Sequence, residues 1–195
     1  MKRWFVLIIL MFLVSSVWGD LHDGLMKAVK NRDKNMILSL LKKGAHVNGL
    51  KERGQRPLCL ATQLGDIKIV KLLVTQGADV NLRDSYLQDM DDAYYSEYTP
   101  LDNACYYKHF HIVKYLVSHG ANINDPDDHQ SYALNMAANG GDINICRYLI
   151  GRGAIINPPL QYGTKTPLFV AARFGQLKIC KLLIEHDAKV NVLCE

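Results

Sequence analysis

Gly120-Ala121-Asn122-Ile123-Asn124 is one copy of a five-residue marker that organises nearly the whole chain. Four related copies surround it: Gly44-Ala45-His46-Val47-Asn48, Gly77-Ala78-Asp79-Val80-Asn81, Gly153-Ala154-Ile155-Ile156-Asn157 and Asp187-Ala188-Lys189-Val190-Asn191. The final Asn residues of successive copies are separated by 33, 43, 33 and 34 positions, so the period is 33 residues with one insertion of ten. Self-similarity at such a period is typical of a stacked solenoid, in which each unit packs against its neighbours.

A second marker lies in register inside four of these periods. Its copies are Arg56-Pro57-Leu58-Cys59-Leu60-Ala61, Thr99-Pro100-Leu101-Asp102-Asn103-Ala104, Tyr132-Ala133-Leu134-Asn135-Met136-Ala137 and Thr166-Pro167-Leu168-Phe169-Val170-Ala171. It resembles the T-P-L-H-x-A helix start of ankyrin repeats, and the resemblance covers Leu21 to Asn191. The resemblance implies an all-α ankyrin-repeat solenoid of about five helix-turn-helix units with protruding loops. The departures are local: no copy keeps the His, Ala133 replaces the Pro, and Lys108 stands where other repeats have a turn glycine.

Elementary physical chemistry accounts for this pattern. A Thr before Pro caps a helix whose first residue needs no N–H group. Gly65, Gly141 and Gly175 permit the positive φ that lets one helix stop and the next turn back. The second helix of each unit then carries apolar residues at helical spacing, as at Val70 and Leu73. One helix pair alone would leave this stripe exposed to water, whereas stacking five pairs buries it.

The markers divide the chain into units 20–48, 49–81, 82–124 with the ten-residue insertion, 125–157 and 158–191, followed by a tail, 192–195. The first unit lacks the Pro-Leu marker and is rich in lysine, which is typical of a capping repeat with a polar outer face. The last unit has the apolar pattern of an interior repeat. We therefore expect either self-association through this uncapped unit or a fragment of a longer repeat array.

Residues 1–19 have the layout of an export signal. A basic start is followed by an unbroken apolar run from Trp4 to Val14, and Gly19 stands before the expected cleavage site. The run is shorter than the roughly 20 residues that a membrane-spanning helix needs. We expect an exported protein, periplasmic or secreted. The alternative is a membrane anchor formed by residues 4–18 that stays uncleaved.

The most distinctive stretch runs from Asp84 to Tyr98 and contains the ten extra residues. It holds five acids and four tyrosines but no basic residue. Such insertions fall in the loops between repeats, and tyrosine supplies amphipathic contact area that is enriched at interface hot spots. We therefore predict a partner-binding edge around repeats three and four. Its eight residues are Tyr86, Asp89, Asp91, Asp92, Tyr94, Tyr95, Asp127 and Asp128.

Charge and motifs argue against several other function classes. The formal charge of +4 falls to +2 without residues 1–19, and no helix carries the basic stripe that is typical of a nucleic-acid binder. The chain has no Gly-rich phosphate loop, no G-x-S-x-G elbow and no H-E-x-x-H motif, so we expect no catalytic residue and no cofactor. No metal site is expected, because the acids of the insertion fit no calcium loop and His109 and His111 diverge on a helix.

The five cysteines indicate core packing rather than a disulfide framework. Cys146 and Cys180 occupy the same position of successive second helices, where packed helices lie about 8–10 Å apart. This exceeds the roughly 7 Å limit between the Cα atoms of a disulfide. Cys194, near the C-terminus, is expected to be exposed and able to bridge two chains in an oxidising compartment.

The sequence thus predicts a non-catalytic protein–protein interaction module. It would bind through its loop tips and inner helical face around repeats three and four, with tyrosines as anchors and aspartates steering a basic partner surface. Three alternatives stay open. The insertion can be a solvated loop without a partner, the chain can be a solenoid that self-assembles through its last repeat, or it can be a membrane-anchored accessory protein.

Overall fold

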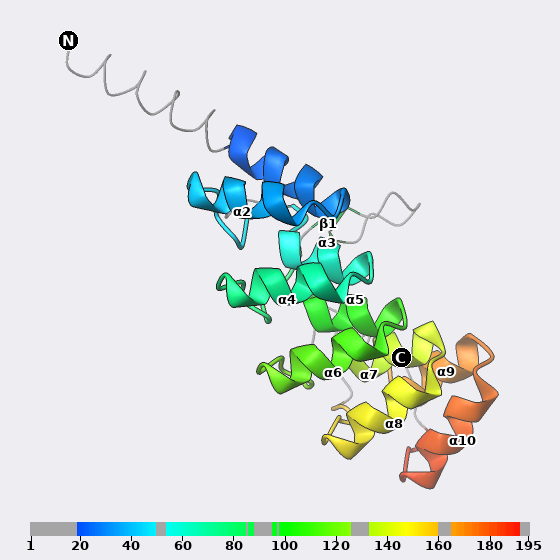
Figure 1. Cartoon of the computed structure of the whole chain (residues 1–195). Coiled ribbons are helices and arrows are strands. Elements are labelled where there is room, and N and C mark those ends of the chain that lie inside the picture. The colour runs from blue at the N-terminus through cyan, green and yellow to red at the C-terminus, as the bar shows by residue number, and fades with distance from the viewer. Residues whose placement is uncertain are drawn as a thin grey trace.

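A computed structural model describes residues 19–49, 54–84, 86–87, 95–96, 98–125, 133–159 and 165–191. Within these ranges the chain is a stack of helix pairs, and the predicted all-α ankyrin-like solenoid is confirmed (Figure 1). The predicted signal up to residue 18, the alternative anchor at 4–18 and the tail at 192–195 lie outside the described residues. No helix within the described ranges combines the length and the apolar content needed to cross a membrane.

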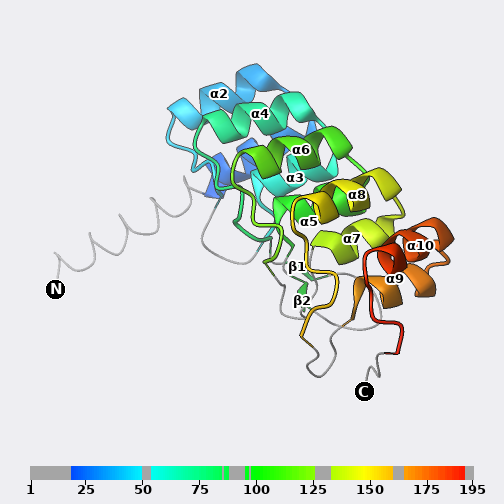
Figure 2. The same ribbon diagram turned by 90° about the horizontal axis from the view of Figure 1, so that it is seen from below.

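The helices form two rows. The first helices of the repeats are α3 (Pro57–Gln63), α5 (Pro100–Tyr106), α7 (Ala133–Gly140) and α9 (Pro167–Arg173). The second helices are α2 (Lys34–Lys42), α4 (Ile67–Thr75), α6 (Phe110–Ser118), α8 (Ile143–Gly151) and α10 (Leu177–Glu185). Residues 19–30 are also helical and pair with α2 in the first unit. Figure 2 shows second helices along one side of the stack and the inter-repeat loops along the other, with the first helices between them.

Local sequence explains where these helices begin. Proline occupies the first turn of α3, α5 and α9, where its missing N–H group needs no partner. Thr99 caps α5 and Thr166 caps α9, because each side-chain oxygen accepts a hydrogen bond from the backbone N–H three residues later. An aspartate caps three of the second helices in the same way: Asp33, Asp66 and Asp142.

The turn inside a repeat keeps one backbone shape even where glycine is absent. Gly65, Gly141 and Gly175 have φ angles of 71°, 82° and 68°. Lys108 stands at the equivalent position and has a φ angle of 62°. This departure from the repeat pattern therefore leaves the turn unchanged, although a left-handed backbone costs a non-glycine residue about 1–2 kcal/mol.

The marker asparagines join consecutive repeats. We call them the asparagine ladder: Asn48, Asn81, Asn124 and Asn157. The backbone N–H of Ile155 donates to Oδ1 of Asn124 at 2.9 Å, while Nδ2 of Asn124 donates to the oxygen of Gly153 at 2.9 Å. Asn81 and Asn157 make the same pair of bonds to the next loop, and Asn48 makes the first of them. The asparagine of the sequence marker therefore makes the contact that holds one loop against the next.

One core runs along the stack. Its small members are the alanines at equivalent positions of the first helices, all fully buried: Ala61, Ala104, Ala137 and Ala171. Three cysteines are also buried in it, Cys59, Cys105 and Cys146, and the four described cysteines are free thiols. Burial raises the pKa of Cys146 to about 12, so its neutral thiol packs as a small apolar group. The predicted core packing of these cysteines is confirmed, whereas Cys194 lies outside the described residues.

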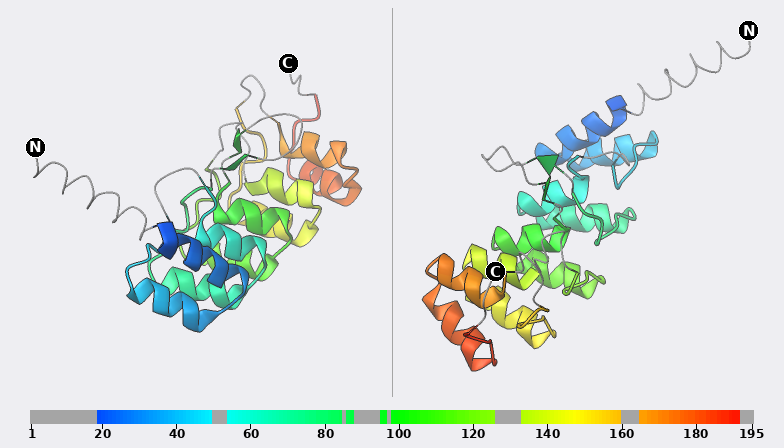
Figure 3. Two further views of the ribbon diagram at one scale, coloured as in Figure 1. Left: turned by 90° about the horizontal axis from the view of Figure 1, so that it is seen from above. Right: turned by 180° about the vertical axis from the view of Figure 1, so that it is seen from behind.

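The insertion of the third repeat contains a short strand pair that the sequence pattern does not predict. β1 (Tyr86–Leu87) and β2 (Tyr95–Ser96) run antiparallel, with Tyr86 opposite Ser96 and Leu87 opposite Tyr95. The two further views of Figure 3 place the strands on the loop side of the stack, away from the second helices. These two described segments of the insertion therefore pair with each other.

Candidate functional site

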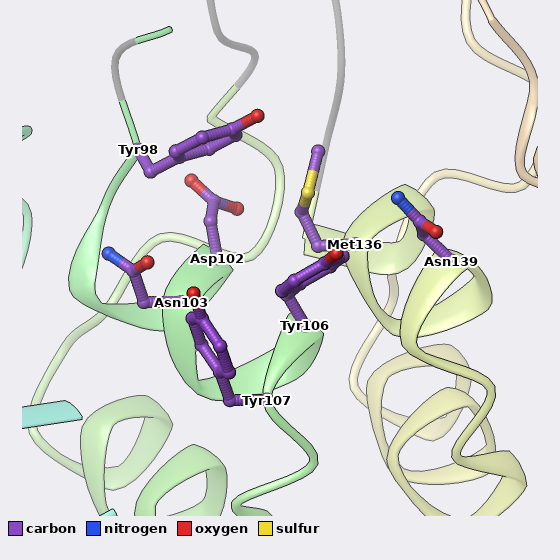
Figure 4. Close-up of a pocket in the computed structure, with 7 residues that line it drawn as sticks. All are labelled: Tyr98, Asp102, Asn103, Tyr106, Tyr107, Met136 and Asn139. Atoms are coloured by element: carbon purple, nitrogen blue, oxygen red, sulfur yellow. The ribbon is translucent and has the colours of Figure 1, made fainter. Parts of the chain in front are cut away.

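A hollow of about 150 Å³ lies on the first-helix face of repeats three and four (Figure 4). Seven of the described residues line it, and we call them the tyrosine face: Tyr98, Asp102, Asn103, Tyr106, Tyr107, Met136 and Asn139. The first lies just before α5, the next four belong to α5 and its C-terminal turn, and the last two belong to α7. The hollow therefore lies where two repeats meet, beside the base of the insertion.

The repeat period brings these side chains together. Tyr106 and Asn139 are 33 residues apart and occupy the same position of successive first helices, as do Asn103 and Met136. Gly140 allows the end of α7 to pack closely on α5, because a Cβ atom there would lie only 2.6 Å from the backbone oxygen of Tyr106. The close approach of the two helices is what forms one hollow from two sets of side chains.

Two neighbouring tyrosines form one wall of the hollow. The rings of Tyr106 and Tyr107 meet edge to face, with centroids 5.1 Å apart, and both residues are exposed. Nε2 of Gln63 in the preceding repeat donates to the hydroxyl of Tyr107 at 2.9 Å. The Tyr107 ring also stacks on His109 at 6.4 Å. These contacts hold the aromatic wall in place while its surface stays accessible to a partner.

A buried carboxylate lies on the floor of the hollow. Asp102 is 5% exposed, and its Oδ2 accepts hydrogen bonds from the backbone N–H of Thr99 at 2.9 Å and from the Thr99 hydroxyl at 2.6 Å. Asn103 is fixed beside it, because its Nδ2 donates to the backbone oxygen of Thr99. The helix cap of α5 thus holds the carboxyl group of Asp102 in one position beneath the tyrosines.

The base of the insertion is tied to the preceding repeat through Asp84. The backbone N–H of Asp84 donates to the oxygen of Tyr98 at 2.8 Å, which closes the neck of the insertion. The Asp84 side chain is buried and its Oδ1 accepts from the backbone N–H of Arg56 at 2.6 Å. Burial raises the pKa of this carboxyl to about 6, and the bond from Arg56 offsets only part of that effect.

An ion pair joins the neck of the insertion to the following loop. Nη2 of Arg83 lies 2.6 Å from Oδ2 of Asp125, and both side chains are partly buried. Arg56 reinforces the same region, because its Nε donates to the backbone oxygen of Arg83 and its Nη1 donates to that of Asn48. The loops on either side of the tyrosine face are therefore fixed relative to one another.

The structure places only part of the predicted binding edge. Tyr86 lies in β1 and Tyr95 lies in β2, so the structure describes their backbone pairing but not their side chains. The other six residues lie outside the described part of the chain: Asp89, Asp91, Asp92, Tyr94, Asp127 and Asp128. The edge predicted from the sequence therefore stays a prediction.

Sequence reasoning missed the tyrosine face. Its signal was present in the comparison of repeats: Tyr106 and Tyr107 stand where the next repeat has Asn139 and Gly140. The other two aligned repeats have Gln63-Leu64 and Arg173-Phe174 at these positions, so only this repeat places two adjacent aromatic rings there. Aligning the first helices position by position would have placed them beside Met136.

The described residues hold no group of three or more His, Cys, Asp or Glu side chains that could bind a metal ion. His109 occupies the N-cap position of α6, as its alignment with Asp66 predicts, but its side chain does not cap the helix. Instead its Nε2 lies 3.2 Å from the backbone oxygen of Gln63, and its ring fills the space next to Gly65. This histidine packs one repeat against another.

Comparison with known proteins agrees with this geometry. The family model described as ankyrin repeats (3 copies) matches residues 25–127 and 125–194. The chain belongs to the ankyrin repeat family. Ankyrin repeats are generally protein–protein interaction modules and are generally not catalytic, which agrees with the lack of catalytic motifs in this ankyrin repeat chain.

Relatives support the assignment over most of the ankyrin repeats. The chain is 30% identical over 158 residues to an ankyrin repeat and KH domain-containing protein of Caenorhabditis briggsae, covering 80% of this chain and 5% of that protein. Two fowlpox virus ankyrin repeat proteins are each 28% identical to it. These matches cover 80% and 74% of this chain, and 33% and 89% of the viral proteins. The chain thus spans only 5% of the length of the Caenorhabditis briggsae protein.

Proposed function

We propose that this ankyrin repeat protein binds a partner protein through the tyrosine face together with the insertion of the third repeat. The observation that carries the proposal is the hollow between α5 and α7, in which exposed tyrosine rings stand over a buried carboxylate. Aromatic rings held rigidly give contact area at a low entropic cost, and such residues dominate the energetics of interfaces.

The electrostatics of this region favour a partner with a basic surface. The tyrosine face contains one carboxylate and no basic side chain, and the adjoining stretch from Asp84 to Tyr98 holds five acids, of which Asp84 is buried. Complementary charge steers the encounter between two proteins and disfavours partners of like charge. In this proposal the predicted edge (Tyr86, Asp89, Asp91, Asp92, Tyr94, Tyr95, Asp127 and Asp128) extends the contact along the loops.

A cross-linked pull-down from fractions of the native cell tests this function. We compare the wild type with a face variant, Tyr106→Ser with Tyr107→Ser, and with an insertion variant in which Asp89, Asp91, Asp92, Tyr94 and Tyr95 are all Ala. The matched control is Phe174→Ser, which removes an exposed aromatic at the turn position equivalent to Tyr107. Circular dichroism first establishes that each variant is folded.

The face variant is expected to lose a partner that the wild type and the Phe174→Ser control both capture. Loss from the insertion variant as well would extend the interface to the predicted edge. Capture of the same proteins by all four chains would contradict the proposal, because neither the tyrosines nor the acids would then contribute to binding.

A second candidate function is self-association through the last repeat, and a specific observation favours it. Five exposed large apolar residues gather on α9, α10 and the turns around them: Phe169, Phe174, Leu177, Ile184 and Val190. Phe169 is 39% exposed, whereas Cys59, Asp102 and Asn135 are buried at the equivalent position of earlier repeats. In those repeats the next unit covers the position.

Sedimentation of the wild type and of Ile184→Lys at micromolar concentration tests self-association. We expect the wild type to form a larger species and Ile184→Lys to be a monomer, since a buried lysine disfavours an apolar contact. Met36→Lys is the control, because Met36 is equally exposed at the opposite end of the stack. A wild type that sediments as a monomer would remove this candidate.

For localisation we propose export directed by residues 1–19, with anchoring by residues 4–18 as the alternative. The support is the sequence layout alone, a basic start followed by an apolar run. N-terminal sequencing of the protein from native cells tests it, since a chain that begins at Asp20 indicates cleavage. A chain that retains residues 4–18 and sediments with membranes would favour the anchor.

A further inference from the structure

The hollow of the tyrosine face offers an unusual combination of groups for one small cavity. Three tyrosine rings, Tyr98, Tyr106 and Tyr107, border it, and the carboxylate of Asp102 lies at its floor. Two side-chain amides, from Asn103 and Asn139, and the thioether of Met136 also line it. Figure 4 shows these side chains around one space, with Tyr98 coming from the segment before α5 and the others from α5, its C-terminal turn and α7.

This set of groups favours a cation over an anion or an apolar side chain. The faces of tyrosine rings carry negative potential and attract a cation that lies within about 6 Å of the ring centre. The buried carboxyl group of Asp102 adds oxygen atoms at the floor that favour a cationic donor. An anion would be repelled by both, and an apolar group would offer no hydrogen-bond donor to the amide oxygens at the rim.

The shape and chemistry of the hollow favour guanidinium over ammonium. A guanidinium group is planar, so it stacks on aromatic rings, and its five N–H donors point outward in its own plane. Amide oxygens and tyrosine hydroxyls at the rim can accept from such donors. A cavity of about 150 Å³ is large enough for the end of one side chain and too small for a folded element of a partner.

We propose that this hollow receives the guanidinium group of an arginine side chain from the partner protein. The arginine lies against the tyrosine rings, with its charge above Asp102 and its donors directed to the amide oxygens. This inference rests on the proposed function, because it names the chemical group by which a basic partner engages the tyrosine face.

Three capped pentapeptides test the proposal without the partner: Gly-Ser-Xaa-Ser-Gly with arginine, lysine or citrulline at the central position. Citrulline has nearly the shape of arginine but no charge. Binding to the full chain is followed by nuclear magnetic resonance of isotope-labelled tyrosine rings, which reports whether Tyr106 and Tyr107 are contacted. We expect the arginine peptide to bind about tenfold more tightly than the citrulline peptide.

Two variants examine the groups that make the site. Tyr106→Leu keeps the apolar bulk and removes the ring, and its control is Tyr148→Leu on the second helix α8. Asp102→Asn removes the charge, and its control is Asp79→Asn, a carboxylate on a neighbouring loop. Each site variant is expected to lower the affinity for the arginine peptide severalfold, whereas the controls leave it unchanged.

Equal binding of the arginine and citrulline peptides, or no shift of the tyrosine resonances, would overturn the proposal. Equal binding of the lysine peptide would overturn the assignment to guanidinium. The comparison of peptides uses the wild type only, so it stands even if a variant does not fold. The proposed function fails separately, when the pull-down shows no loss of partner from the face variant although the arginine peptide binds.

Discussion

Lys108 holds a left-handed backbone at the position where three other repeats have glycine. Replacing it with glycine removes a steric strain of about 1–2 kcal/mol and adds some conformational entropy to the unfolded chain. We expect Lys108→Gly to raise the free energy of unfolding by about 0.5–1 kcal/mol, measured by urea denaturation. The matched control is Gly120→Ala, which introduces the same strain at a φ of 87° where the added Cβ atom meets no neighbour.

The control is expected to lower the free energy of unfolding by about 1 kcal/mol. A loss of stability in Lys108→Gly would contradict the strain argument, because it would mean that the lysine side chain contributes more to folding than its backbone conformation costs.

Asp84 makes stability depend on pH in the direction opposite to that of most carboxyl groups. Its pKa in the folded protein is about 6, above the ordinary value of 3.8, because the group is buried at the neck of the insertion. The folded state therefore binds the proton more tightly than the unfolded state. The resulting stabilisation is fully present below pH 3.8 and is lost as the pH rises through 6.

Ionisation of Asp84 is expected to lower the free energy of unfolding by about 3 kcal/mol as the pH rises from below the unfolded pKa to above the folded one. Each unit of pKa shift corresponds to roughly 1.4 kcal/mol. Asp84→Asn keeps the oxygen that accepts from Arg56 and cannot ionise. Urea denaturation of both chains at pH 4.5 and pH 7 should show that the variant gains stability relative to the wild type at the higher pH. An unchanged difference between the two chains would show that Asp84 does not titrate in this range.

At the scale of the elements, the asparagine ladder explains why the marker recurs. Asn124 makes two hydrogen bonds across the junction between its own loop and the loop of the next repeat. We expect Asn124→Ala to lower the free energy of unfolding by about 2 kcal/mol, because each of these bonds contributes about 1 kcal/mol. Asn191→Ala is the matched control, since Asn191 makes no such bond among the described residues.

Urea denaturation of the two variants measures the difference. An Asn191→Ala variant that loses as much stability as Asn124→Ala would indicate that the asparagines act inside their own loops. In that case the hydrogen bonds between repeats would contribute little to the junctions.

At the scale of the elements, some features can be predicted from the sequence and others cannot. The period, the helix caps at Thr99 and Thr166 and the turn glycines are local signals, so the repeat fold follows from them. The tyrosine face depends on how closely two first helices approach, which is set by the packing of Gly140 on the backbone of Tyr106. Such a contact between residues 34 positions apart has no local signature. The strand pair of the insertion lacks one as well, because each strand is only two residues long.

At the scale of the whole molecule, a stack of repeats has interior units with two neighbours and end units with one. Second helix α6 contacts both α4 and α8, whereas α10 contacts α8 and, among the described residues, no second helix on its other side. Stability in such a stack is a sum of unit and junction contributions. Within the described residues the last repeat therefore has one junction where interior repeats have two, and its apolar residues Ile184 and Val190 are exposed.

Amide hydrogen exchange should reveal this gradient. At low protein concentration we expect the amides of α10 to exchange about tenfold faster than those of α6, because the missing junction lowers the free energy of local opening. Equal exchange would contradict the gradient and would show that all repeats open together. Raising the protein concentration tests whether the exposed apolar residues of the last repeat also form a contact between two copies. If a second copy covers Ile184 and Val190, exchange in α10 slows while exchange in α2 does not, since a contact between copies protects only the helices that it covers.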